Sequence, residues 1–209
     1  MIKIKRTKTP DILAKNAENW KTALLAAKNN NVRNKVEAKY GHKNIKNSLV
    51  NMFHGKCAYC ESQVRHIDYG HIEHYRPKSK FPKLTFEWSN LLLACGVCNG
   101  KAYKGDKFPE ANEGGPIINP ADDDPNDHFN FCYDQKTNIA SVYGTTRRGQ
   151  TTEKLLGLNR DDLRKYRSSY VRKIWVLAQL SKSDSEAKTL LEEAKQDNAE
   201  YAAFVRQLL

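Results

Sequence analysis

The chain has 209 residues, of which 39% are hydrophobic and 10% aromatic, so it can bury a core, and wholesale disorder is excluded. Its formal net charge of +11 favours a polyanionic partner, with nucleic acid ahead of an anionic membrane. The sequence contains no secretory signal and no apolar run of the roughly 18–20 residues that span a bilayer. We therefore expect a cytoplasmic protein with no membrane partner.

The charge is unevenly spread along the chain. Residues 1–56 hold 13 Lys or Arg and 3 acidic residues, whereas residues 110–134 hold 7 acidic residues and no Lys or Arg. Residues 183–209 hold 6 acidic and 3 basic residues. This asymmetry predicts that one face binds a polyanion and that another face has a different partner.

The first predicted elements are two helices, over 11–30 and 44–54, because apolar side chains recur there at helical spacing. Residues 57–82 then lose this periodicity and are rich in Cys, His and Gly. A second Cys-rich segment, "NLLLACGVCNGKAYKGDKFP" (90–109), leads into a short helix. Residues 110–127 are rich in Pro, Gly and Asp and predict a long loop.

The rest of the chain predicts a β-hairpin followed by helices. "FNFCY" and "IASVY" alternate with period two on either side of "DQKTN", which indicates the hairpin. From about residue 151 the pattern is helical again, and Ser183-x-x-Glu186 indicates a capping box that opens the last helix. The helical ends of the chain are candidate docking surfaces. Their apolar residues include Trp20, Leu24, Tyr201, Phe204 and Leu208.

These elements predict an α+β fold organised in four regions. They are a basic helical region (1–54), a small Cys/His-rich core (55–110), an acidic loop with a hairpin (111–150) and a C-terminal helical region (151–209). The core is too short to be stable through hydrophobic burial alone, and a structural metal ion would supply what it lacks.

The cysteines predict where that metal lies. Cys57-x-x-Cys60 and Cys95-x-x-Cys98 are separated by 34 residues, and two such turns can provide four thiolates for a closed tetrahedral zinc site. The alternatives are buried free thiols or an iron–sulfur cluster. A thioredoxin-like redox site is disfavoured because no βαβ pattern surrounds either pair. Cys132 stands apart, within a strand pattern, and is interpreted as a small core residue.

Between the pairs, and directly after the second pair, lie the residue types that phosphodiester hydrolysis requires. His74 can be the base that activates water. Glu73 and Asn99 can be hard oxygen ligands for Mg²⁺ or Mn²⁺, which would neutralise the phosphate and the leaving oxygen. Asn90 can orient the histidine or brace the loop that carries it.

Several segments resemble a known family. "CAYC", "IEHYRPKSKFP" and "WSNLLLACGVCNGKAYKGDKFP" resemble the HNH endonuclease superfamily, whose core is a ββα-metal fold. "INPADDDPNDHFNF" and "LLGLNRDDLRKYR" are similar to the retron- and Septu-associated, PtuB-like subfamily, so the resemblance covers about residues 45–175. It implies a metal-dependent endonuclease of antiviral defence with a PtuA-like ATPase partner. The chain itself has no G-x-x-x-x-G-K-[ST] loop that would bind a nucleotide.

The resemblance also implies roles for the four polar positions. His74 matches the general base, Glu73 the acidic metal ligand before it, and Asn90 the middle Asn that positions the site. Asn99 matches the final metal ligand. The sequence departs from the family name here, since the last letter is Asn instead of His, and we do not interpret this as inactivation.

The alternation of side chains along a strand leaves the identity of one metal ligand undecided. In a regular strand Glu73 and His74 point to opposite faces, so both reach one metal only where the strand bends or ends. His71 shares a face with Glu73 and is therefore an alternative metal ligand.

Cations flank these positions and suit phosphate contacts, which position a strand without reading its sequence. Taken singly, each of them is also typical of a solvated surface charge. Lys101 is the strongest candidate for a phosphate contact. The five are Arg76, Lys78, Lys80, Lys101 and Lys104. The substrate stays open between DNA and RNA, with DNA favoured. The alternative functions are a non-catalytic zinc-dependent nucleic-acid-binding module and a protein-interaction adaptor.

Overall fold

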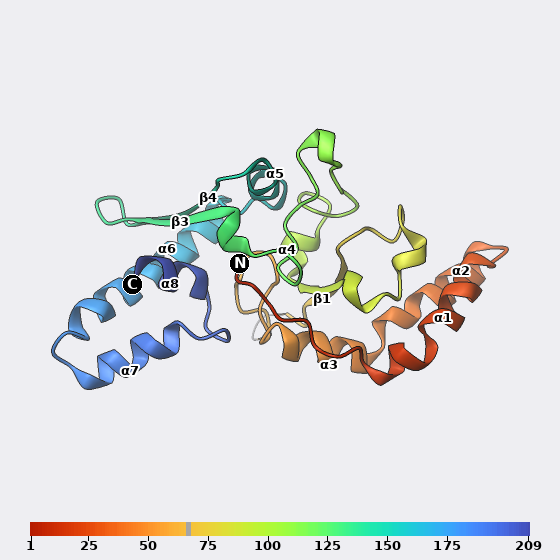
Figure 1. Ribbon diagram of the computed structural model, residues 1–209, viewed down its shortest axis with the longest axis horizontal. Coiled ribbons are helices and arrows are strands. Elements are labelled where there is room, and N and C mark those ends of the chain that lie inside the picture. The colour runs from red at the N-terminus through yellow and green to blue at the C-terminus, as the bar shows by residue number, and fades with distance from the viewer. Residues whose placement is uncertain (66–67) are drawn as a thin grey trace. The chain divides into compact units, whose positions relative to one another are not determined.

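The computed structural model describes residues 1–65 and 68–209 (Figure 1). The chain divides into two compact units. We call Ile4–Ala58 with Val64–Phe108 the cationic unit, and Met1–Lys3 with Tyr59–Gln63 and Pro109–Leu209 the hairpin unit. The cationic unit holds 20 Lys or Arg against 7 Asp or Glu, whereas the hairpin unit holds 15 against 17.

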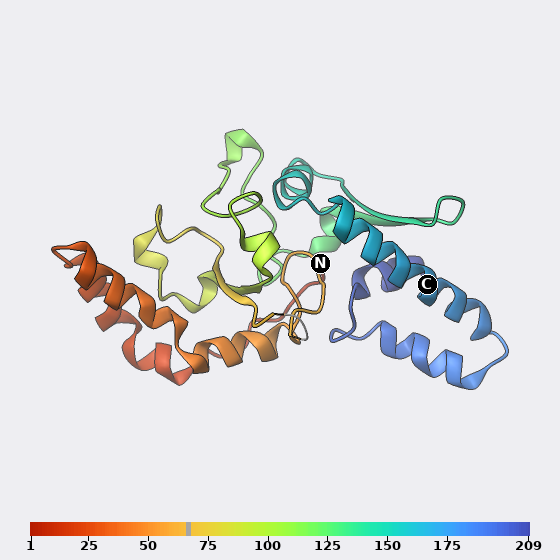
Figure 2. The same cartoon turned by 180° about the vertical axis from the view of Figure 1, so that it is seen from behind.

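The cationic unit begins with three helices. They are α1 (Asp11–Leu25), α2 (Asn30–Glu37) and α3 (Lys43–Met52), and α1 packs against α2 (Figure 2). The single helix expected over 11–30 ends early because the Asn29 side chain accepts a hydrogen bond from Val32 N (3.0 Å) and starts a new helix. The helix expected over 44–54 corresponds to α3.

A small sheet and a short helix form the centre of this unit. Strand β1 (His71–His74) pairs antiparallel with β2 (Leu91–Ala94), with Glu73 opposite Leu92, and α4 (Gly96–Asn99) follows. All four residues of β2 are buried, and α3 packs on that strand. Gly70 precedes β1 with φ +66°, and a Cβ there would lie 3.0 Å from Leu93 Cδ1, so the turn into β1 requires glycine.

The hairpin unit contains the second sheet, and the expected hairpin is confirmed. Strand β3 (Phe129–Asp134) pairs antiparallel with β4 (Ile139–Gly144). Phe129 and Phe131 are buried on one face of β3, whereas Cys132 is exposed. The expectation of a core Cys132 was therefore wrong, because alternate residues of this strand face solvent.

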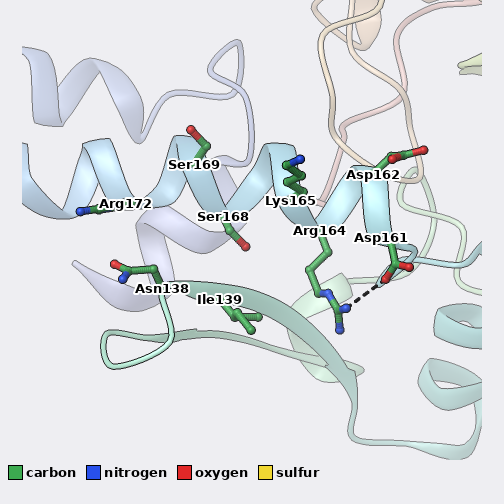
Figure 3. A pocket seen from close by; sticks show the side chains of 9 residues that line it. All are labelled: Asn138, Ile139, Asp161, Asp162, Arg164, Lys165, Ser168, Ser169 and Arg172. Atoms are coloured by element: carbon green, nitrogen blue, oxygen red, sulfur yellow. Dashed lines mark hydrogen bonds and ion pairs between the residues drawn. The ribbon is translucent and has the colours of Figure 1, made fainter.

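Four helices complete the hairpin unit. They are α5 (Arg147–Leu156), α6 (Asp161–Leu180), α7 (Ser185–Ala194) and α8 (Ala202–Leu208). Helix α6 packs on β4 and α8 packs on β3. A groove of about 650 Å³ opens between α6 and the hairpin (Figure 3). No helix among the described residues is both long and apolar enough to cross a membrane.

The last helical region differs from expectation in two ways. Its N-cap is Asp184, whose carboxylate accepts a hydrogen bond from Ala187 N (2.8 Å), so the capping box at Ser183 was wrong by one residue. The single helix is also divided, because Tyr201 adopts a left-handed conformation and its ring is buried against Tyr170. Asp197, in the connecting segment, pairs with Arg206 of α8.

Most of the apolar side chains considered for docking lie in the interior. Leu24, Tyr201 and Phe204 are each at most 1% exposed. These side chains stabilise their own units and are not available to a partner.

Candidate functional site

The four paired cysteines form one cluster. Their Sγ atoms all lie within 4.8 Å of one another, close to the S···S separation of about 3.8 Å in a zinc tetrathiolate. Within the described residues this is the only group of three or more His, Cys, Asp and Glu side chains placed to hold an ion. Ala58 N donates to Leu93 O (2.8 Å), which ties the first Cys turn to β2. The expected structural zinc site is therefore supported by a suitable set of thiolate donors.

Glu73, on strand β1, forms a buried ion pair with Lys104. Its Oε1 is 2.5 Å from Lys104 Nζ, and the two side chains are 4% and 1% exposed. Lys104 Nζ also donates to His74 O (2.9 Å) and Gly105 O (3.3 Å), so its three N–H groups have three acceptors. Lys104 was expected among the surface phosphate contacts. The structure instead places it in the interior, because the loop after α4 folds back onto β1.

His74, the last residue of β1, is held in one orientation. Its Nε2 lies 2.9 Å from Thr85 O, and because a carbonyl can only accept, Nε2 carries the hydrogen. The Tyr40 ring packs edge-on against the imidazole, with centroids 4.6 Å apart. Burial, together with the nearby charges of Lys78 and Lys104, lowers the pKa of His74 to about 4. At neutral pH the ring is uncharged and its Nδ1 is the proton acceptor.

Asn90 braces the end of β1. Its Nδ2 donates to Arg76 O (3.0 Å) and Leu84 O (3.1 Å), and its Oδ1 accepts from Arg76 N (2.8 Å). The side chain is 4% exposed, and these three bonds give both of its N–H groups and its carbonyl oxygen a partner. Asn90 therefore fixes the backbone that follows His74.

Asn99 ends a helix, whereas His71 begins a strand. Asn99 is the last residue of α4, directly after Cys98, and α4 packs against the strand that carries Glu73 and His74. His71 is the first residue of β1 and is exposed, with its Nε2 3.6 Å from Asp68 Oδ2. Both side chains are accessible to solvent, Asn99 only in part.

The remaining predicted cations are in three different settings. Lys78 pairs with Glu37, and Lys80 and Lys101 are exposed. Arg76 lies against two aromatic rings, those of Phe81 and Phe108. Sequence reasoning missed Tyr40 and the Thr85 carbonyl, because neither carries a motif that links it to a histidine many residues away.

Comparison with known proteins agrees with this geometry. Residues 57–105 match the family model described as HNH endonuclease, and that segment contains both Cys pairs, Glu73, His74, Asn90 and Asn99. The chain therefore carries an HNH endonuclease domain.

Two curated relatives define its homology more narrowly. The chain is 35% identical over 166 residues to the Septu protein PtuB of Bacillus thuringiensis, covering 78% of this chain and 56% of that protein. It is 31% identical over 161 residues to the Septu protein PtuB of Bacillus mycoides (strain KBAB4), covering 65% and 53%. The chain thus spans about half the length of the curated relatives that it matches.

Proposed function

We propose that this protein is a metal-dependent HNH endonuclease that hydrolyses phosphodiester bonds in nucleic acid, with DNA favoured over RNA. The observation that carries the proposal is the state of His74, a neutral imidazole whose Nε2–H is engaged by Thr85 O. General-base catalysis needs such a proton acceptor beside the reacting water.

In this mechanism Nδ1 of His74 takes a proton from water as the water oxygen attacks phosphorus. Thr85 O keeps the ring oriented, and Asn90 holds the backbone behind it. Glu73 and Asn99 supply a carboxylate and an amide oxygen, a donor set suited to one Mg²⁺ or Mn²⁺, with His71 as the alternative ligand. Such a cation would neutralise charge on the phosphate and on the departing 3′ oxygen.

The test is cleavage of plasmid DNA and of RNA, each with Mn²⁺ and with EDTA. His74→Ala should fold, keep its zinc and still bind nucleic acid, yet lose roughly 10²–10⁴-fold in rate. His71→Ala, at an exposed position on the same strand, tests the alternative metal ligand and should keep the wild-type rate if Glu73 and Asn99 hold the cation. Cleavage by His74→Ala at the wild-type rate would make His74 the wrong base. Wild-type protein that binds but never cuts would favour the non-catalytic zinc-dependent binding module.

We further propose that the nuclease acts in antiviral defence of the Septu or retron type, beside a PtuA-like ATPase. The two relatives named Septu protein PtuB support this proposal. Co-expression with an adjacent ATPase, followed by size-exclusion chromatography, tests it. A nuclease that elutes alone under all conditions contradicts the partnership and leaves the proposed cleavage chemistry intact.

A further inference from the structure

Arg76 is a cation of the cationic unit that aromatic rings orient. Its guanidinium carbon lies 5.4 Å from the ring centroid of Phe81 and 4.8 Å from that of Phe108. The two rings themselves meet edge to face, with centroids 5.5 Å apart. Contacts of this kind orient the guanidinium and leave its N–H groups available to an anion.

The backbone of the same residue is equally fixed. Asn90 bonds both the N–H and the carbonyl of Arg76, at 2.8 and 3.0 Å. Arg76 is two residues after His74, at the point where the chain leaves β1. The side chain therefore starts from an immobile backbone close to the proposed base and loses little conformational entropy on binding.

No carboxylate of the described residues lies within 4.0 Å of the Arg76 guanidinium, and the residue is partly exposed. The neighbouring cations differ in this respect. Lys78 is neutralised by Glu37, and Lys104 by Glu73. Lys80 is exposed on a flexible side chain. Arg76 alone among these four is both oriented and without a counter-charge.

We propose that Arg76 binds the phosphate group at the cleavage site through its guanidinium fork. This inference rests on the proposed function and assigns one substrate contact within it. A guanidinium matches two phosphate oxygens with two parallel hydrogen bonds, which an ammonium cannot do. The negative charge on those oxygens grows as water attacks, so the contact strengthens in the transition state.

The experiment compares Arg76→Ala, Arg76→Lys and the control Lys83→Ala in cleavage of duplex DNA with Mn²⁺. Arg76→Ala should lose about 10²-fold, mainly in kcat, because it removes a group aimed at developing charge. Arg76→Lys keeps the charge and should recover only part of that loss. Lys83→Ala, which removes an exposed cation of the same unit, should change the rate by less than about 3-fold.

Zinc content and melting temperature of each variant separate this role from a structural one. If Arg76→Lys cleaves like wild type, or Arg76→Ala behaves like Lys83→Ala, the proposal is overturned. The proposal is also overturned if the reduced cleavage rate of Arg76→Ala is fully explained by a smaller fraction of folded protein.

Affinity measurements separate this inference from the proposed function. In a His74→Ala background, which blocks cleavage, Arg76→Ala should weaken duplex binding more than Lys83→Ala does. A wild-type protein that never cuts would defeat the proposed function while this binding difference still supported a phosphate contact. Equal affinities of the two variants would count against Arg76 as that contact.

Discussion

The two units differ in how far acidic residues balance their basic residues. In the hairpin unit Arg148 pairs with Asp123 and Arg206 with Asp197, and in its groove Arg164 pairs with Asp161 (Figure 3). Acidic residues slightly outnumber basic ones in that unit, 17 to 15. In the cationic unit, 20 basic residues meet only 7 acidic ones. The excess positive charge of the protein therefore belongs to the unit that carries Glu73 and His74.

The units also differ in what stabilises them. In the hairpin unit the buried Arg167 bonds to the carbonyls of Ala140 and Leu158 and lies 4.9 Å from the Phe204 ring, without a carboxylate partner among the described residues. The cationic unit buries the Glu73–Lys104 ion pair and the neutral His74, which the proposed cleavage uses. It also holds Cys57, Cys95 and Cys98 of the cysteine cluster, so we expect metal ligation to contribute to its stability.

The largest expected effect is removal of the metal from the cysteine cluster. We expect about one zinc per chain, and binding to structural sites of this kind contributes roughly 10–16 kcal/mol that is also folding free energy. Chelation, or Cys57→Ser, should abolish the cooperative unfolding transition of the protein, measured by calorimetry. Cys132→Ser, at an exposed position, is the control and should keep both zinc and melting temperature. A metal-free protein with unchanged melting would contradict the zinc site.

The next effect concerns the buried ion pair. Lys104→Met keeps the side-chain volume but leaves the Glu73 carboxylate without its partner, which typically costs about 3–5 kcal/mol. Urea unfolding should show this loss. Adding Glu73→Gln to the same chain should restore most of the stability, because the uncompensated charge is then absent. Equal stability of the single and double variants would mean that the pair contributes no coupling energy.

These two effects differ in how far the sequence predicts them. The paired Cys-x-x-Cys motifs indicate the cluster directly, since their spacing is local and their chemistry is narrow. The burial of Lys104 has no such signal, because a lysine in a basic loop has the same appearance whether it faces solvent or Glu73. Its place depends on the loop after α4 packing against β1, which is a tertiary contact.

The same limit applies to helix ends and to His74. The hairpin is predictable because alternation and turn residues act over a few positions. The break before Tyr201 is not, because it depends on a ring packing against Tyr170 of a distant helix. The family resemblance predicts His74 as the base, but only the fold shows which ring nitrogen faces Thr85 O.

A smaller effect is expected in the pH dependence of stability. Because the pKa of His74 is about 4 in the folded protein and about 6.5 unfolded, the unfolded chain binds more protons between these values. The free energy of unfolding should fall by about 3 kcal/mol as pH drops from about 6.5 to about 4, and be independent of this group above pH 6.5. Subtracting the stability of His74→Ala from that of wild type at each pH separates the contribution of His74 from that of thiolate protonation. A wild-type curve parallel to the variant's would contradict a buried neutral imidazole.

The smallest effects separate the charges of the two units. If nucleic acid binds the cationic unit, removing one cation that binds a phosphate should reduce the slope of log affinity against log salt by about 1. Lys80→Ala and Lys101→Ala change exposed cations of that unit, and Lys165→Ala and Arg172→Ala change exposed cations along the groove of the hairpin unit (Figure 3). All four remove one positive charge, so a general charge effect would move them equally. We expect the slope to change for Lys80 and Lys101 only, measured by fluorescence anisotropy with duplex DNA between about 50 and 200 mM salt. Equal changes in all four variants would show that the whole surface, rather than the unit carrying His74, attracts the polyanion.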